Sequence, residues 1–284
     1  MDSAKVGERG EPGTRQRPQR RPEPWHRSAA FDILQFVALV CVLSWIIVHG
    51  AQGMGYKWQW DKVPRLLLRV VDSELILGPL TKGLLVTLDI TWIAMTLTIA
   101  IGLGVAMLRL SNSVVGRALA GCYVELVRNT PILVQILIIY FIIGRILPIP
   151  RFWAGVLCLA LYEGAFAAEI IRGGVVSVKK GQWEASRSLG FSEFDTYRDI
   201  IIPQAIPLIL PPLAGVLVNL VKHSAIVSVI AVFDLATQAR TVVSDTFLAF
   251  EVWFTVAGLY LIITLSLSLV VSALEKRYGQ TSRA

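Results

Sequence analysis

The sequence predicts an all-α, polytopic membrane protein with six transmembrane helices, and three observations carry that prediction. First, 55% of the 284 residues are hydrophobic, 17% are charged and the mean hydropathy is +0.63, whereas a soluble domain of this length carries more charge. Second, the apolar residues form runs of about 20, the length that a helix needs to cross a bilayer core of roughly 30 Å. Third, the net charge is +7, and the basic residues lie between the apolar runs. This arrangement is typical of basic loops beside membrane spans and not of a nucleic-acid-binding face.

The N-terminal segment divides into a polar tail and an apolar run. Residues 1–30 are rich in Arg, Pro, Gly and Glu and contain almost no aliphatic side chains. These residues can bury too little apolar surface to offset the conformational entropy that they would lose on ordering. They are therefore predicted to be a disordered, basic, cytoplasmic tail. The run 33–48, within the segment 31–49, is interpreted as an extra, uncleaved N-terminal transmembrane span. A signal peptide is the alternative, but the basic region before the run is long and no clear small-x-small cleavage site follows.

A polar stretch separates this span from the rest of the chain. Residues 50–80 are predicted to be an extracytoplasmic segment. The piece 64–77 within it is predicted to be an interfacial helix and not a span, because charged side chains interrupt its apolar residues.

The remaining spans form a five-helix core domain over residues 81–278. They are predicted at 83–108, 122–143, 152–171, 204–221 and 252–273. Between the last two lies an apolar run, 225–233, that is too short to cross a membrane. Such a run is either a re-entrant piece that lines a pore or a part of the packed core, and both interpretations stay open here.

Basic residues predict the orientation of the spans. With the N-terminus in the cytoplasm, the cytoplasmic segments carry 18 of the 27 Lys and Arg residues and the opposite side carries 9. Because Lys and Arg concentrate in cytoplasmic loops, both termini are predicted to be cytoplasmic. The loop 172–203 is then cytoplasmic as well.

The loop 172–203 carries more helix-forming detail than a plain connection of its length. Gly190 divides it, because glycine most easily adopts the positive φ that ends a helix. Ser192 follows as an expected N-cap, with Asp195 at the capping-box position. The sequence therefore predicts two short helices around a turn, which project from the membrane as a docking element for a cytoplasmic partner.

The spacing in this loop resembles the cytoplasmic signature of permease subunits of ATP-binding-cassette (ABC) importers. That signature is Glu-Ala-Ala, three residues, Gly, nine residues, Ile, one residue, Leu-Pro. Here Glu184-Ala185-Ser186 is followed after three residues by Gly190, and after nine more by Ile200, one residue and Ile202-Pro203. The departures are serine for alanine at 186 and isoleucine for leucine at 202, and both are small changes in volume.

Flanking segments narrow the resemblance to the polar amino acid uptake branch of these importers, the histidine, glutamine and glutamate type. The segments similar to that branch are Val124-Glu125-Leu126-Val127-Arg128-Asn129-Thr130-Pro131, Ala168-Glu169-Ile170-Ile171-Arg172-Gly173-Gly174, Gly181-Gln182 and Lys222-His223-Ser224. The resemblance covers about residues 80–278, and the extra span and the tail lie outside it.

The resemblance implies a multi-pass protein of the bacterial cytoplasmic (inner) membrane with several partners. Two permease subunits, identical or different, would pair in the lipid, an ATPase dimer would dock on the cytoplasmic side, and an extracytoplasmic amino-acid-binding protein would deliver substrate. No enzymatic activity is expected of this chain, because its nearest approach to a phosphate-binding loop, 78–83, is followed by Leu84 and lies on the wrong side of the membrane. No catalytic residue, metal ligand, cofactor or nucleic-acid partner is predicted.

The resemblance also implies how the loop would act. Its first helix would sit in a groove of the ATPase, so that closure of the ATPase dimer would move the spans between inward- and outward-open states. Glu184 would pair with a basic group of the ATPase, and the alternative for this residue is an ordinary solvated charge. The residues predicted to couple the two subunits are Gln182, Glu184, Ala185, Gly190, Ile200 and Pro203.

Prolines and ionisable side chains within spans point to a substrate path. Pro203, Pro207 and Pro211 recur every four residues and predict a bent or broken span, unless the kink only serves packing. Ionisable groups within spans are costly unless they are paired or face water. Glu169 and Arg172 are three residues apart and are predicted to form a structural pair.

Glu163 is the preferred path residue, because it lies near the middle of its span and its carboxylate would meet the ammonium group of a substrate. His223 is a weaker candidate. The full set of candidate path residues is Asn129, Thr130, Glu163, Asn219, Lys222 and Ser224.

An ion-gradient-driven secondary transporter of small polar solutes is the alternative function. Such a transporter usually has two halves of related hydropathy, and this chain has neither such halves nor a pair of coupling acids. A membrane enzyme is a further alternative. It would need clustered His, Cys or carboxylate residues at one membrane face, and the three histidines of this chain are scattered.

Overall fold

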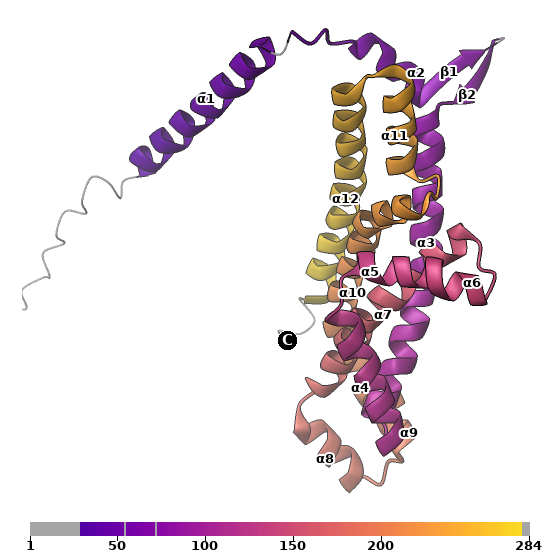
Figure 1. Cartoon of the computed structure of the whole chain (residues 1–284). Coiled ribbons are helices and arrows are strands. Elements are labelled where there is room, and N and C mark those ends of the chain that lie inside the picture. Colours follow the sequence, from indigo (N-terminus) through magenta and orange to yellow (C-terminus); the bar gives the residue numbers. More distant parts are fainter. Residues whose placement is uncertain (1–28, 54, 72, 280–284) are drawn as a thin grey trace, which may run out of the picture. The chain divides into compact units, whose positions relative to one another are not determined.

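The computed structural model describes residues 29–53, 55–71 and 73–279, so the predicted tail, 1–30, lies almost wholly outside the described residues. Most of the described residues are helical, which confirms the all-α class (Figure 1). Contacts divide the chain into two compact units, one that ends at Trp58 and one that begins at Gln59.

The first unit contains one long helix, α1 (Ala29–Gly53). Its stretch Phe31–Gly50 is long and apolar enough to cross a membrane. Nearly all of its described side chains are exposed within this unit. The rings of Trp45 and His49 stack with their centroids 5.1 Å apart. The helix covers the segment 31–49, and its role as an extra membrane span stays a prediction.

The second unit opens with four short elements. They are the 3-10 turn η2 (Trp60–Lys62), the helix α2 (Val63–Leu67) and the strands β1 (Leu68–Val71) and β2 (Glu74–Leu77). The strands pair antiparallel, with Leu68 opposite Leu77. The predicted interfacial helix over 64–77 is therefore wrong from Leu68 onward. β-Branched side chains such as Val70 favour the extended backbone, and Ser73, with a φ of 66°, forms part of the hairpin turn.

Two long helices form the centre of the second unit, α3 (Pro79–Leu110) and α7 (Arg151–Val176). Small residues let them approach closely, since a Cβ built on Gly102 would lie 2.8 Å from the Cβ of Ala167. Ile90 of α3 and Leu159 of α7 are fully buried in one hydrophobic cluster. These helices provide the rigid frame on which the remaining elements pack.

The predicted span 122–143 is not one straight helix. Its residues are divided, with a bend of 106°, between α4 (Val114–Arg128) and α5 (Ile132–Leu137), which continues through the π-helical turn η3 (Ile138–Ile143) to α6 (Gly144–Ile146). Pro131 is the N-cap of α5, where its missing N–H removes no helical hydrogen bond. Gln135 holds the corner by donating from Nε2 to the carbonyl of Val127 at 2.8 Å and to Thr130 Oγ1 at 2.7 Å. The predicted span therefore contains a proline corner that turns the chain.

The helix α10 (Ile202–Ser224) contains four prolines and follows the π-helical turn η4 (Thr196–Ile201). Of the bent or broken span predicted from the prolines, the break is not observed, since the stretch Glu193–Ile230 qualifies as a single candidate span, and the bend stays a prediction. Prolines four residues apart remove hydrogen bonds from one side of a helix, and the bonds on the other side remain. The prolines therefore mark one face of α10 without interrupting it.

The chain ends through the 3-10 turn η5 (Ala225–Ile230), α11 (Leu235–Thr246) and α12 (Ala249–Gly279). In η5, Val227 is fully buried and a Cβ built on Gly155 of α7 would lie 3.0 Å from its Cγ1. Of the two interpretations of the run 225–233, the structure supports core packing. Figure 1 shows α8 at one end of the second unit, which we call the α8 end, and α11 beside the hairpin at the other, the α11 end.

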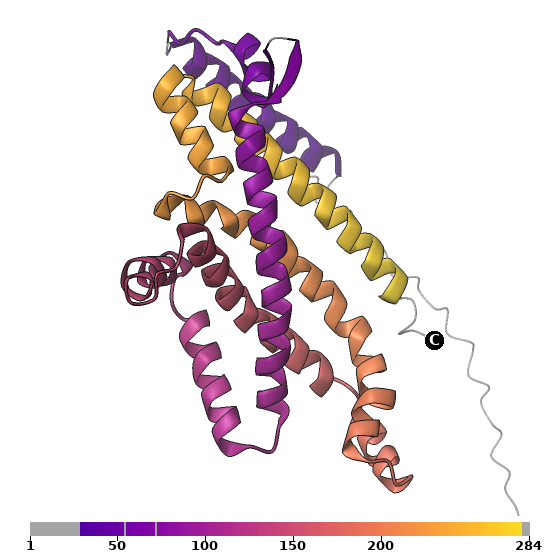
Figure 2. The ribbon, with the colours of Figure 1, turned by 90° about the vertical axis from the view of Figure 1, so that its right-hand side faces the viewer.

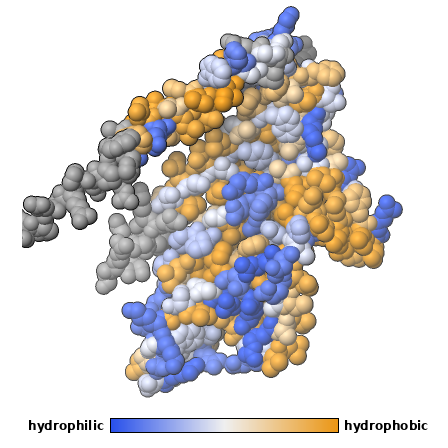
Figure 3. Space-filling model, turned by 60° about the vertical axis from the view of Figure 1, so that its left-hand side comes forward, coloured by the Kyte–Doolittle hydropathy of each residue, from blue (hydrophilic) through white to orange (hydrophobic). Residues whose placement is uncertain are grey.

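The described helices agree with the predicted number of spans. Five are long and apolar enough to cross a membrane, or six if the bent pair of α4 and α5 counts as one span. Figure 2 shows α3 running from the hairpin to the end at which α4 begins. Figure 3 shows apolar side chains over wide areas of the surface and hydrophilic ones at the α8 end. Large apolar side chains such as those of Trp92 and Leu269 are exposed, and lipid would cover them.

Candidate functional site

The loop 172–203 forms two helices, as predicted, although α7 first continues to Val176. They are α8 (Lys180–Ser188) and the short α9 (Glu193–Asp195). Gly190 between them has a φ of 79°, the positive value that ends a helix. Ser192 accepts a hydrogen bond from the backbone N of Asp195 at 3.2 Å and therefore caps α9.

Contacts with η4 hold α8 in place. Thr196 donates from Oγ1 to Ser186 Oγ at 3.2 Å, and both residues are buried. The ring of Trp183 meets that of Tyr197 edge-on, with centroids 5.1 Å apart. Ser186, where the importer signature has alanine, thus helps to keep α8 against the base of α10.

Three of the predicted coupling residues lie on the open side of α8. Gln182, Glu184 and Ala185 are exposed. The side chain of Glu184 is 63% exposed and lies 3.4 Å from Lys180, one turn earlier. Exposed pairs of this kind contribute little free energy, so Glu184 can exchange Lys180 for another cation at small cost.

The other three predicted coupling residues have structural positions. Gly190 forms the turn after α8. Ile200 packs in a cluster with Val175 and Val178, at the end of α7. Pro203 lies in the first turn of α10, directly after the π-helical turn η4. These residues fix α8 to α7 and α10.

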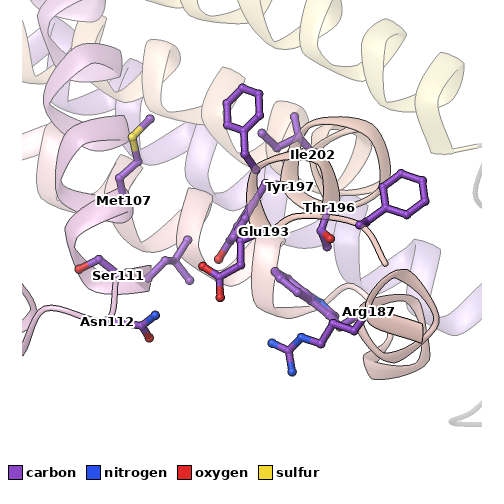
Figure 4. Close-up of a pocket in the computed structure, with 12 residues that line it drawn as sticks. Met107, Ser111, Asn112, Arg187, Glu193, Thr196, Tyr197 and Ile202 are labelled. Atoms are coloured by element: carbon purple, nitrogen blue, oxygen red, sulfur yellow. The ribbon is translucent and has the colours of Figure 1, made fainter. Parts of the chain in front are cut away.

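A hollow of about 650 Å³ lies between the end of α3 and these short helices (Figure 4). Aromatic side chains form much of its lining, namely Trp183, Phe191, Phe194 and Tyr197. Figure 4 shows Glu193 and Tyr197 lying between Ser111 on one side and Arg187 on the other. Sequence reasoning missed the hollow because its lining joins segments that are far apart along the chain.

A second pocket, of about 230 Å³, lies between α7 and α10. It brings together Glu163 and Asn219, two of the predicted path residues, with the weaker candidate His223. Glu163 is 2% exposed, and its Oε1 lies 2.7 Å from Nδ1 of His223. The ring of Tyr162 meets the imidazole edge-on, with centroids 5.7 Å apart. The rest of the lining is Phe166, Ile170, Pro212, Gly215 and Val216.

Four predicted path residues do not line this pocket. Asn129 and Thr130 donate from their side chains to carbonyls in the last turn of α4, at 2.7 and 2.8 Å. Lys222 is exposed, and Ser224 is buried and donates to the carbonyl of Val221 at 2.7 Å. No group of three or more His, Cys, Asp or Glu residues in the described ranges is arranged to hold a metal ion.

Glu169, nearer the α8 end of α7, is surrounded by three arginines. Arg172 donates from Nη2 to its Oε2 at 3.2 Å, which confirms the predicted pair. Arg109 of α3 pairs with Oε1, and Nη1 of Arg128 lies 4.0 Å from Oε2. The guanidinium of Arg128 also lies 5.2 Å from the centre of the Phe166 ring, which lines the pocket. The cluster ties together α3, α4 and α7.

Comparison with known proteins decides the family. Residues 98–280 match the model of the family described as binding-protein-dependent transport system inner membrane component. The chain belongs to this family of permeases. The membership confirms the resemblance found in the loop 172–203, and the permease is a multi-pass inner-membrane protein.

Named relatives cover most of this permease. The glutamine transport system permease protein GlnP of Escherichia coli (strain K12) is 36% identical over 229 residues, which are 79% of this chain and 98% of the relative. The "Probable glutamine ABC transporter permease protein GlnM" of Bacillus subtilis (strain 168) is 42% identical over 192 residues, 67% of this chain and 89% of the relative.

Solved structures agree with the fold of the permease. A structure titled "Crystal structure of an amino acid ABC transporter with histidines" is 41% identical with a TM-score of 0.67, and the match covers 70% of this chain and 94% of that one. An inward-facing structure of the MetNI methionine ABC transporter is 20% identical with a TM-score of 0.56, and covers 69% of this chain and 95% of that one, so it supports the fold alone.

Proposed function

We propose that this permease forms the translocation path of an ABC importer for polar amino acids and that a separate ATPase dimer drives it. Relatives named as glutamine permeases and a solved amino acid transporter support amino acids as the cargo. The pocket between α7 and α10 supports a path through this subunit. Glu163, 2% exposed within a candidate span, is the carboxylate of this pocket, and the ammonium group of an amino acid would pair with it beside His223.

Within the pocket, the amide of Asn219 would bind the carboxylate of the substrate while Glu163 meets its ammonium. Asn129 and Thr130 would border the path at the corner after α4. Lys222 and Ser224 would border it at the end of α10. These four residues lie outside the pocket, so their contribution would be smaller than that of Glu163 and Asn219.

The α8 end is proposed to face the cytoplasm, together with both termini. The excess of Lys and Arg in the segments assigned to that side supports this orientation. The binding protein would then dock at the α11 end. In this arrangement 31–49 is an extra span, 50–80 is extracytoplasmic and 81–278 is the permease domain.

One observation supports the proposed coupling of ATP hydrolysis to transport. The docking loop and the pocket share a continuous helical stretch, Glu193–Ile230, in which η4 supports α8 and α10 lines the pocket. A movement of α8 by an ATPase would therefore reach Asn219 and His223 through one helix. The exposed side chains Gln182, Glu184 and Ala185 would contact the ATPase.

The remaining partners follow from the same arrangement. A second permease subunit, identical or different, would complete the path beside this one in the lipid. The ATPase dimer would carry the nucleotide sites, and this chain would hydrolyse nothing itself.

Reversal of one exposed charge tests the coupling. Glu184→Lys leaves the side chain exposed and the fold intact, but places a positive charge where the ATPase is expected to present one. We expect normal amounts of the variant in membranes and a loss of ATP-driven amino acid uptake in vesicles by about tenfold or more, since like charges at an interface repel.

Asp199→Lys is the matched control, because Asp199 carries the same charge in the same loop and pairs locally with Arg198 at 2.8 Å. It is expected to retain most of the uptake. Normal ATP-driven uptake by Glu184→Lys would contradict the coupling role of α8. Uptake that depends on an ion gradient and not on ATP would contradict the importer and support a secondary transporter.

A further inference from the structure

His223 is placed to control the charge of the pocket between α7 and α10. Its Nδ1 lies 2.7 Å from Oε1 of Glu163, a distance typical of a charge-assisted hydrogen bond. The two residues are 60 positions apart and come from different helices. The carboxylate is buried, whereas the imidazole is partly exposed in the pocket.

The pocket has one acidic group. Among its lining residues, all within the described part of the chain, Glu163 is the one carboxylate. The uncharged polar side chains in the lining are those of Tyr162 and Asn219. A cationic group that enters the pocket therefore has one anionic partner, and His223 already holds it.

We propose that the Glu163–His223 pair is a charge filter that selects amino acids without net charge. The inference rests on the amino acid path proposed above. In this filter His223 acts in its protonated form beside the Glu163 carboxylate, so that the pocket offers one positive and one negative group. A zwitterion is complementary to this pair, because its ammonium binds Glu163, its carboxylate binds His223 together with the amide of Asn219, and every charge keeps a partner.

A cationic amino acid does not satisfy the pair in this way. Its side chain brings a second positive charge next to His223, and the lining holds no second carboxylate for it. A charge that is removed from water without a partner is strongly disfavoured. His223 is thus the element that rejects lysine and arginine, and Glu163 attracts the ammonium group that all amino acids share.

Direct binding to the permease–ATPase complex in lipid nanodiscs tests the filter. The binding protein is left out because it makes its own selection, and the probes are glutamine and arginine in isothermal titration calorimetry. The wild-type complex is expected to prefer glutamine. His223→Gln keeps a hydrogen-bond donor but removes the cation, and is expected to reduce the preference for glutamine over arginine by about tenfold or more.

Two further variants separate charge from structure. His223→Lys retains a positive charge and is expected to keep the preference for glutamine. His49→Gln makes the same exchange in α1 and is expected to change nothing. Glu163→Gln is expected to weaken glutamine binding by about tenfold without improving arginine binding, since the ammonium loses its partner.

An unchanged preference in His223→Gln overturns the filter, and so does a preference lost equally in His223→Lys. If His223→Gln does not fold, a gain of arginine binding in Glu163→Gln overturns it instead. Failure of both probes to bind the wild-type complex shows that the pocket is no substrate site and also overturns the filter. The proposed import function is judged separately, by ATP-driven uptake in the complete transporter with its binding protein.

Discussion

Asp234 is a buried carboxylate at the start of α11, outside the candidate spans. Its Oδ1 accepts a hydrogen bond from the backbone N of Thr237 at 2.9 Å, and Oδ2 accepts one from that of Ala236 at 3.2 Å. Burial raises the pKa of Asp234 above the ordinary value of aspartate, and these hydrogen bonds oppose the shift in part. The cap stabilises α11, while the removal of the charge from water offsets part of that gain.

Two substitutions separate the cap from the charge. Asp234→Ala removes both and is expected to lower the free energy of unfolding by about 1 kcal/mol, whereas Asp234→Asn keeps a capping oxygen and is expected to cost only a few tenths of that. Thermal unfolding of the purified permease in detergent measures the difference. Because the folded-state pKa is raised, the wild type should lose stability relative to Asp234→Asn as the pH rises from the ordinary aspartate value through the raised one. The opposite trend would contradict the burial of an ionised carboxylate.

Single residues could be predicted from the sequence where their partners are close along the chain. The turn at Gly190 and the cap at Ser192 depend on residues within one helical turn, and both were correct. The pair of Glu163 with His223 joins different helices, so no local rule could find it. The ion pair between Arg109 and Glu169 was missed for the same reason, because it joins α3 to α7.

At the scale of elements, the crossing of α7 and α10 depends on one glycine. A Cβ built on Gly174 would lie 2.2 Å from Cγ1 of Ile209, whereas one built on the neighbouring Gly173 would meet nothing within 4 Å. The two glycines lie in the same helix, so a substitution at either has a similar effect on helix propensity. Any difference in stability between variants at these two positions therefore reports the packing of α10 on α7.

We expect Gly174→Val to lower the free energy of unfolding by about 1–3 kcal/mol relative to Gly173→Val, because the added methyl groups overpack the crossing. Thermal unfolding of both variants, purified in the same detergent, measures this difference. Equal unfolding temperatures would show that α10 does not rest on Gly174.

Elements were predictable where hydrophobicity alone determines them. Long apolar runs placed α3, α7 and α12 within a few residues, because only a helix satisfies its backbone in lipid. The hairpin of β1 and β2 was missed because four-residue strands leave too short a pattern. Pro131 indicates a helix break, but the angle of 106° could not be predicted because the apolar residues continue on both sides of the proline.

At the scale of the whole molecule, the second unit joins the proposed docking surface on α8 to the pocket between α7 and α10. The family could be predicted because one spacing pattern in the loop 172–203 records it, whereas the pocket and the hollow beside α8 depend on how helices pack. The stretch Glu193–Ile230 links the two regions and gives the account its mechanical basis. Coupling requires contact between the exposed face of α8 and a separate ATPase in the cytoplasm.

Photo-crosslinking from position 184 tests that contact most directly. A photo-activatable amino acid in place of Glu184, in inside-out membrane vesicles that contain the ATPase, should form a covalent adduct between the two chains. The same substitution at Ser244, exposed on α11, should form none. An ATPase adduct from position 184 and none from position 244 is the result that the account predicts. No adduct from position 184, or one from position 244 alone, would contradict it.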